Sequence, residues 1–221
     1  MSPASTGAGF LTLRGGHRMG LCGRVTCERD GLVLRETGSL CLRIAHEVKD
    51  CGADTARMLR GGGALIAGPP GSGKTTLLRD IVRILSDEGT AVGLCDERGE
   101  IAACVEGVPQ LDVGPNTDVL DGCAKEAGLR WMLRAMSPQA LVTDELGGAM
   151  DAQAVLDAAR SGVSVLATLH GRDLQAALSR GILYHLAQNR VFDRYALLDE
   201  NEVGCVRAVC DEQLRPLEAA P

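Results

Sequence analysis

Aromatic side chains are scarce in this chain: Phe, Trp and Tyr make up 2% of its 221 residues. Aliphatic side chains must therefore fill the core. Aromatic stacking platforms, on which many proteins hold single-stranded nucleic acid, have few candidates. The formal net charge of −6 also argues against a protein that coats nucleic acid, because binding to phosphates requires an excess of Lys and Arg. We therefore expect a globular protein without a nucleic-acid partner.

Three further patterns are missing from the sequence. No apolar run approaches the roughly 20 residues of a membrane-spanning helix, and the N-terminus lacks the basic-then-apolar pattern of a secretion signal. The nine cysteines include no C-x-x-C pair. Cys22/Cys27 and Cys205/Cys210 could each form the first half of a zinc site, but no second pair follows at the required distance. We expect a cytoplasmic protein whose cysteines are small buried hydrophobes.

Lysine occurs only at positions 49, 74 and 125, and Lys74 lies in a recognisable motif. Residues 68–75 fit G-x-x-x-x-G-K-[ST], the phosphate-binding loop of nucleoside-triphosphate hydrolases. Its glycines let backbone N–H groups point at phosphate oxygens, Lys74 reaches the β- and γ-phosphates, and the Thr75 hydroxyl coordinates Mg²⁺. The predicted ATP-binding residues are Gly68, Pro69, Pro70, Gly71, Ser72, Gly73, Lys74, Thr75 and Thr76.

The flanks of this loop have the required pattern. Residues 63–67 form a short apolar run that is typical of a buried strand, and apolar residues recur at helical spacing over 77–85. Further strands alternate with helices, which predicts an α/β fold with a mostly parallel sheet and ligands at the carboxyl ends of its strands. We expect strands at 91–95, 140–143, 163–168, 191–198 and 203–209, helices at 54–60, 122–136, 151–160 and 173–186, and mixed structure at 99–122.

The N-terminal part has a different pattern. Residues 1–9 are small and polar and are expected to form a disordered leader. Short alternating segments separated by turn signals follow, including one turn at Thr37-Gly38-Ser39 and a basic, exposed turn around His17. We predict a partial β-rich domain of antiparallel hairpins at 10–52, followed by the ATPase core at 53–221.

Acidic residues follow two of the predicted strands. Asp144 and Glu145 end the strand that begins at Ala140; Asp144 would hold Mg²⁺ opposite Thr75, and Glu145 would polarise the attacking water. Glu97, just past the strand at 91–95, competes for the role of this base. Either pattern also suits a solvated loop or a helix start. At this stage both glutamates remain candidates.

His170 ends the strand at 163–168, on the same predicted edge of the sheet. There it could sense the γ-phosphate or a polarised water. A histidine is more often structural, but its position at a strand end favours the functional interpretation. The predicted catalytic residues are Lys74, Glu97, Asp144, Glu145 and His170, with Thr75 and Asp144 at the metal.

Several motifs occur in the order seen in a known superfamily. The chain resembles the type II and type IV secretion ATPases, and within them the stage III sporulation protein AA family, over about residues 10–198. The segment Asp96-Glu97-Arg98 also resembles the catalytic glutamate region of RecA-like hexameric motors such as the Rho helicase. The stretches that carry the family resemblance are 14–21, 44–48, 118–122, 133–138, 145–148, 158–162 and 166–171.

This resemblance implies a RecA-like ATPase that works as a homo-oligomeric ring, expected to be a hexamer, beside membrane proteins of a secretion or sporulation channel. It implies ATP and Mg²⁺ as cofactors, a peripheral location at a membrane complex, and a longer N-terminal domain of which only the last hairpins are expected here. Secretion ATPases usually carry Gly-Glu with an arginine after it, whereas Leu146-Gly147-Gly148 follow Glu145 here. The candidates for an arginine acting on a neighbouring subunit are Arg98, Arg130 and Arg134.

Two other functions compete with this one. A RecA- or Rho-type motor would be stimulated by nucleic acid, which the acidic net charge disfavours. A regulatory module would bind ATP without hydrolysing it.

Overall fold

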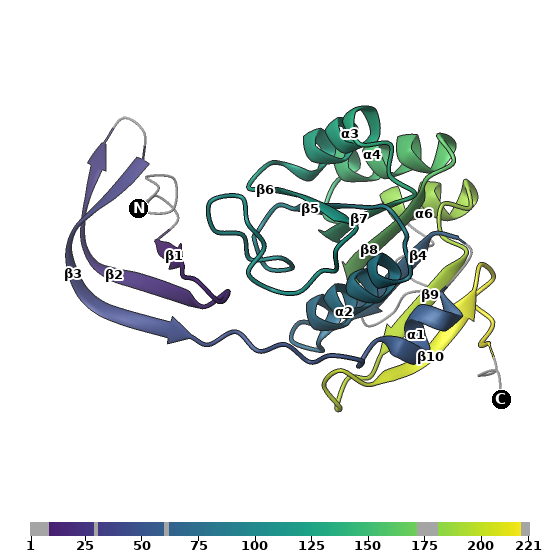
Figure 1. The fold of residues 1–221 in the computed structure, drawn as a ribbon, viewed down its shortest axis with the longest axis horizontal. Coiled ribbons are helices and arrows are strands. Elements are labelled where there is room, and N and C mark those ends of the chain that lie inside the picture. The colour runs from purple at the N-terminus through teal and green to yellow at the C-terminus, as the bar shows by residue number, and fades with distance from the viewer. Residues whose placement is uncertain (1–8, 29–30, 60–61, 172–180, 218–221) are drawn as a thin grey trace. The chain divides into compact units, whose positions relative to one another are not determined.

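The structure is a computed structural model that describes residues 9–28, 31–59, 62–171 and 181–217 (Figure 1). Nearly all of the predicted leader lies outside these residues, as does the first part of the helix expected at 173–186. The chain forms two compact units. One contains residues 1–47 and 102–111, and the other contains residues 48–101 and 112–221. The predicted limits of the domains, at residues 52 and 53, stay a prediction.

The first unit is a small antiparallel sheet. Its strands, in the order β1-β2-β3, are β1 (Phe10–Thr12), β2 (Arg18–Glu28) and β3 (Gly31–Arg43). The turn expected at residues 37–39 was wrong, because β3 continues through it. Cys22 pairs with Ser39 and Gly23 with Thr37, so Gly38 is the extra residue of a β-bulge.

The segment 102–111 returns to this first unit from the middle of the chain. The N–H of Gly15 donates to Gln110 Oε1 over 3.0 Å, and Val105 and Val108 form an isolated antiparallel bridge. His17 is half-buried and its Nδ1 accepts the N–H of Ala45 over 3.1 Å, so the expectation of an exposed turn histidine was wrong.

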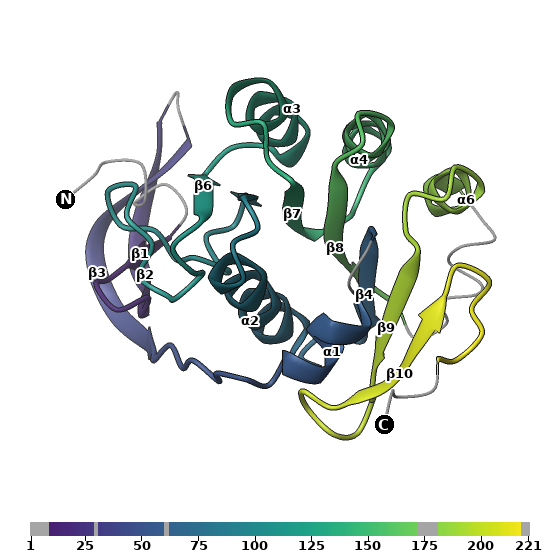
Figure 2. The same cartoon turned by 45° about the vertical axis from the view of Figure 1, so that its right-hand side comes forward.

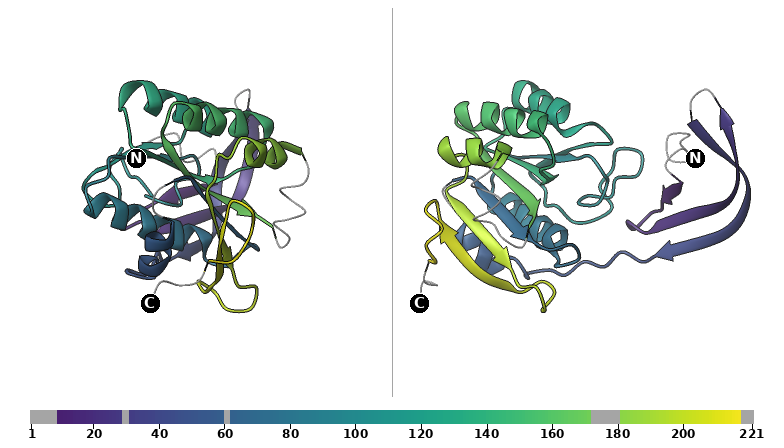
Figure 3. Two further views of the ribbon diagram at one scale, coloured as in Figure 1. Left: turned by 90° about the vertical axis from the view of Figure 1, so that its right-hand side faces the viewer. Right: turned by 180° about the vertical axis from the view of Figure 1, so that it is seen from behind.

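The second unit is built on a seven-stranded sheet with the order β10-β9-β4-β8-β7-β5-β6. All neighbours are parallel except the β9–β10 hairpin, which is yellow-green to yellow in Figure 3. The prediction of a mostly parallel α/β sheet is confirmed. The strands are β4 (Ala64–Gly68), β5 (Val92–Asp96), β6 (Thr117–Asp121), β7 (Ala140–Glu145), β8 (Ser164–His170), β9 (Arg194–Leu198) and β10 (Val206–Asp211).

Helices cover both faces of this sheet (Figure 2). On one face lie α1 (Ala53–Met58) and α2 (Lys74–Asp87), and on the other lie α3 (Lys125–Ala135), α4 (Ala149–Arg160) and α6 (Gly181–Gln188). Leu77, Leu78 and Ile81 of α2 are fully buried. The core on the other face is almost entirely aliphatic, as the scarcity of aromatics requires, although Phe192 and Tyr195 are buried within it.

The mixed stretch 99–122 contains the strand β6, which is partly exposed at the edge of the sheet. One local expectation in this unit was wrong. Asp151 does not precede α4 as its cap but is the third residue of the helix, in its first turn. Its Oδ2 accepts the backbone N–H groups of Gly147 and Gly148 over 3.0 and 3.2 Å, which satisfies donors at the helix start.

The cysteines are free thiols, and their burial varies. Cys95 and Cys210 are buried, as expected. Burial raises the pKa of the Cys95 thiol, and the neighbouring Cys123 adds to this effect. Four others are exposed, which contradicts the expectation that the cysteines serve as buried hydrophobes; they are Cys22, Cys27, Cys41 and Cys51.

Candidate active site

The carboxyl ends of four adjacent parallel strands bring the predicted site residues to one edge of the sheet. The strands lie in the order β4-β8-β7-β5. Gly68 pairs with His170 across β4 and β8, and Glu145 pairs with Thr168 across β7 and β8. Residues that are far apart in the sequence therefore meet where open α/β sheets bind their ligands.

The loop between β4 and α2 has the backbone that its glycines allow. Gly71 and Gly73 adopt φ angles of 77° and 94°, which side chains other than glycine's rarely permit. Gly73 directly precedes α2, so the N–H groups of the first helical turn face the loop. The Ser72 hydroxyl donates to the carbonyl oxygen of Pro69 over 2.8 Å. The loop can therefore receive an anion at the positive end of a helix.

A turn between β9 and β10 packs against this loop. The N–H of Gly204 donates to the carbonyl oxygen of Ser72 over 2.9 Å. A side chain at Gly73 would bring its Cβ within 3.0 Å of the Gly204 nitrogen, so glycine is needed for this close approach as well as for its φ angle.

Lys74 begins α2 and is buried with 6% of its surface exposed. Its Nζ donates to the carbonyl oxygens of Gly68 and Pro69 over 2.9 and 2.6 Å. Burial lowers the pKa of Lys74, and the charge of Glu145 opposes this shift. Of the other predicted loop residues, Ser72 and Pro69 are buried, Thr75 and Thr76 are half-buried, and Pro70 and Gly71 are exposed.

Glu145 and His170 form a pair across β7 and β8. His170 Nε2 lies 2.8 Å from Glu145 Oε2, and Arg98 Nη1 lies 3.7 Å from the same oxygen. The Glu145 side chain is 27% exposed and that of His170 is 39% exposed, so solvent reaches both. A carboxylate and an imidazole in contact at a wet strand edge can orient a water molecule and share its proton.

Asp144 and Glu97 share a different partner, Lys125 at the start of α3. Lys125 Nζ lies 2.8 Å from Asp144 Oδ1 and 3.3 Å from Glu97 Oε2, and it also donates to the carbonyl oxygen of Glu145. Burial lowers the pKa of Lys125, but the two carboxylates outweigh this effect and raise it overall. The sequence analysis did not identify Lys125 as a site residue. The only signal that could have pointed to it is that lysine is rare in this chain, with three residues in all.

The donor set around Asp144 fits a hydrated Mg²⁺. Both carboxylate oxygens of Asp144 and the Thr143 hydroxyl are buried and have no hydrogen-bond partner among the residues that the structure describes, although Lys125 Nζ lies at ion-pair distance from Asp144 Oδ1. Buried polar atoms are rarely left in this way without a ligand or water. Within the same part of the chain no group of three or more His, Cys, Asp or Glu side chains could hold a metal. Mg²⁺ bound with a nucleotide takes most of its ligands from phosphates and water, so one carboxylate and the Thr75 hydroxyl suffice.

One of the other arginine candidates, Arg130, is paired within the subunit: it lies 3.7 Å from Asp157 of α4.

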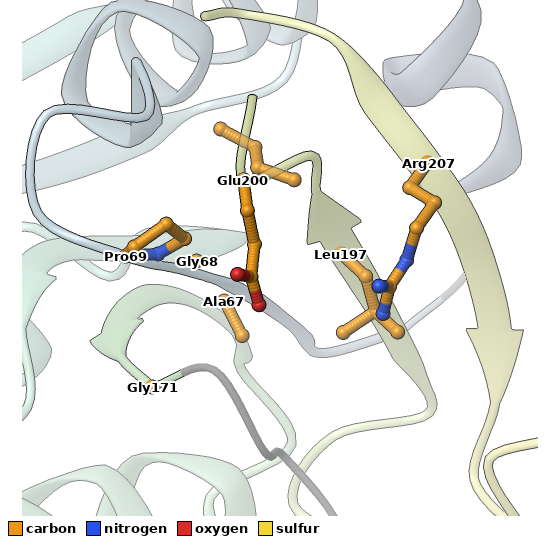
Figure 4. Close-up of a pocket in the computed structure, with 8 residues that line it drawn as sticks. Ala67, Gly68, Pro69, Gly171, Leu197, Glu200 and Arg207 are labelled. Atoms are coloured by element: carbon orange, nitrogen blue, oxygen red, sulfur yellow. The ribbon is translucent and has the colours of Figure 1, made fainter. Parts of the chain in front are cut away.

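The cavity beside the phosphate-binding loop is small. It has a volume of about 30 Å³ and lies beside Gly68 and Pro69, and Glu200 and Arg207 extend toward it from the β9–β10 hairpin (Figure 4). It is far below the roughly 300 Å³ of a small-molecule site. A larger cavity, of about 370 Å³, lies near the amino ends of β7 and β8, away from the loop, and Glu88 is the one charged side chain among the described residues that line it.

A family model described as "Sporulation stage III, protein AA" matches residues 5–216. The chain belongs to this family. It is 43% identical over 215 residues to the stage III sporulation protein AA of Bacillus subtilis (strain 168), an alignment that covers 92% of this chain and 70% of that protein. It is also 29% identical over 154 residues to the type IV pilus assembly ATPase PilB of Acinetobacter baylyi, covering 70% of this chain and 25% of PilB.

A solved structure confirms the RecA-like fold. The pilus retraction motor PilT with bound ADP superposes with a TM-score of 0.58, covering 89% of this chain and 62% of PilT at 17% identity. The sporulation family to which the chain belongs is thus related to the secretion and pilus ATPases in both sequence and fold. The chain spans only a quarter of PilB, so functions of that whole protein do not transfer by similarity alone.

Proposed function

We propose that the chain hydrolyses ATP with Mg²⁺ and that this reaction powers a sporulation-associated secretion or channel complex. The observation that carries the proposal is the convergence of three strand ends on one edge: Lys74 follows β4, Asp144 and Glu145 end β7, and His170 ends β8. The family membership and the relationship to pilus ATPases support it.

Each residue has a role that follows from its chemistry. The loop 68–75 and the start of α2 bind the phosphates through backbone N–H groups. Lys74 exchanges its contacts with the carbonyls of Gly68 and Pro69 for phosphate oxygens. Thr75 and Asp144 hold the metal, which neutralises charge on the β- and γ-phosphates when it is bound.

Glu145 is the better candidate for the base that orients the attacking water. Both carboxylates are reached by solvent, but that of Glu145 contacts His170, whereas that of Glu97 is paired with the buried Lys125. A carboxylate that is held by a buried ammonium is less free to orient a water molecule. We assign Glu97 to the electrostatic support of Asp144.

The larger assembly is part of the same proposal. We infer a homo-oligomeric ring, hexameric by analogy with the superfamily, that acts at a membrane complex through membrane-protein partners. Arg98 is the best placed of the three arginine candidates, since it is 60% exposed beside Glu145. Among the residues that the structure describes, no helix combines the length and the apolar character needed to cross a bilayer.

The test is the rate of ATP hydrolysis with Mg²⁺, measured together with the mass of the protein in solution with and without nucleotide. We expect Lys74→Ala to abolish binding and turnover, and Glu145→Gln to keep binding while kcat falls at least about 100-fold. Glu36→Gln is the matched control, because Glu36 is exposed in the first unit and pairs only loosely with Arg24 at 3.6 Å.

Three results would contradict this proposal. Turnover that survives Glu145→Gln but not Glu97→Gln would move the base to Glu97. Tight ATP binding without turnover in the wild type would identify a nucleotide-holding module. Hydrolysis that requires added nucleic acid would support the RecA- or Rho-type motor.

A further inference from the structure

Lys125 breaks two rules of protein electrostatics at once. It is only 4% exposed, although a buried ammonium is costly unless it is paired. It is also the first residue of α3, where the helix dipole disfavours a positive charge. Residues whose local placement is energetically unfavourable are commonly found at functional sites, and other interactions compensate for the cost in stability.

The surroundings of Lys125 show what offsets this cost. Its ammonium carries three N–H donors, and three oxygen atoms surround it: Asp144 Oδ1 at 2.8 Å, Glu97 Oε2 at 3.3 Å and the carbonyl oxygen of Glu145. These oxygens come from the ends of β5 and β7, which are neighbours in the sheet. A single side chain therefore ties α3 to both acidic strand ends.

The two carboxylates would repel each other without this cation. Cys95 pairs with Thr143 across β5 and β7, so Glu97 and Asp144 follow a paired position on adjacent strands. Asp144 is nearly buried, which makes its negative charge expensive without a partner. Lys125 reduces the charge of the trio from −2 to −1.

Lys125 lies against one of the two oxygens of Asp144. Both oxygens are buried without a hydrogen-bond partner among the described residues, and the ammonium lies 2.8 Å from Oδ1. We propose that Lys125 is a positioning residue: it holds Asp144 and Glu97 in place and keeps Asp144 Oδ2 available to the hydration shell of Mg²⁺. This inference rests on the proposed function, since it assumes that Asp144 serves the metal.

According to this proposal, Lys125 and Lys74 contribute differently to the affinity for nucleotide. Lys74 contacts the phosphates and is needed for nucleotide affinity whether or not a metal is present. Lys125 acts through Asp144, so its removal should affect only the part of the affinity that Mg²⁺ adds. A residue that merely stabilised α3 would change both parts equally.

The experiment measures the binding of a fluorescent ATP analogue to the full chain, first in EDTA and then during a Mg²⁺ titration. For Lys125→Met we expect wild-type affinity in EDTA and an increase of about tenfold in the Mg²⁺ concentration that gives half of the metal-dependent gain. Lys125→Arg should give an intermediate value, because it restores the charge but not the compact ammonium.

Lys49→Met is the matched control. Lys49 also pairs with an aspartate, Asp112 at 2.6 Å, but this pair is half-exposed and lies outside the site. Its Mg²⁺ titration should match that of the wild type. Wild-type Mg²⁺ dependence in Lys125→Met, or equal loss of affinity with and without Mg²⁺, would overturn the positioning role.

Lys125→Met leaves two carboxylates uncompensated and can unfold the site. The double variant Lys125→Met/Glu97→Gln removes one charge of each sign, and circular dichroism checks its fold. It should show the same weakened Mg²⁺ dependence, and a wild-type titration would again contradict the proposal. The wild type tests the proposed function separately. If Mg²⁺ does not change its affinity for the ATP analogue, the proposed function itself fails.

Discussion

Glu145 and His170 contact each other at this sheet edge, and both side chains remain open to solvent. Their separation of 2.8 Å joins the ends of two neighbouring strands. A histidine in this position can hold the carboxylate in one orientation while the carboxylate accepts a proton from water. The pair therefore accounts for the histidine more fully than a role in sensing phosphate alone.

We predict that His170→Ala lowers kcat about 100-fold while KM for ATP stays near the wild-type value. The reason is that the imidazole of His170 contacts the carboxylate of the proposed base. Steady-state kinetics with saturating Mg²⁺ test this. His185→Ala is the control, because His185 is exposed on α6. A raised KM with unchanged kcat would mean that His170 only helps to bind nucleotide.

At this scale the sequence predicts what is local. The loop 68–75 carries its geometry in consecutive glycines, and Asp144, Glu145 and His170 follow apolar strands directly. No local pattern identifies Lys125, because its three partners lie 19 to 28 residues away on other elements. The sequence could not decide between Glu97 and Glu145 for the same reason, because the decision depends on which side chain each carboxylate contacts in the folded protein.

The β2–β3 hairpin shows how a single glycine decides the form of an element. Gly38 is displaced into a bulge, and opposite it a Cβ on Gly23 would lie 1.9 Å from the carbonyl oxygen of Glu36. No side chain fits there. The sequence pattern Thr-Gly-Ser reads equally well as a turn, since turns and bulges use the same residues, which is why two short strands were expected where β3 is continuous.

We predict that Gly23→Ala destabilises this hairpin by about 1–3 kcal/mol, because the backbone of β3 must move to admit the methyl group. Hydrogen exchange of the amides in β2 and β3 measures the effect in the full chain. Gly20→Ala in the same strand is a close control, since its Cβ would meet only ordinary contacts with Cys41, the nearest at 3.6 Å. Equal exchange in the two variants would show that the hairpin tolerates the substitution by shifting its register.

At the scale of the whole molecule, the sheet order was open to inference only in part. Alternating strands and helices predict a parallel sheet, but they do not reveal that β4 lies between β8 and β9. The return of residues 102–111 to the first unit was also hidden, because composition and periodicity are read along the chain. Contacts between segments so far apart leave no local pattern.

This return makes a cut near residue 48 a poor division of the protein. The segment 102–111 packs with residues 1–47: a Cβ on Gly16 would lie 3.0 Å from Leu111 Cδ2, and Gln110 accepts the N–H of Gly15. We predict that a chain beginning at residue 48 is less soluble and melts at a lower temperature than the full chain. Replacing 102–111 with a short Gly-Ser linker in the truncated chain should restore solubility, because it removes the apolar side chains left without partners. Sedimentation and thermal melts compare the full chain, the truncated chain and the truncated chain with the linker. If the truncated chain stays soluble and melts like the full chain, residues 102–111 do not need the first unit, and the prediction is wrong.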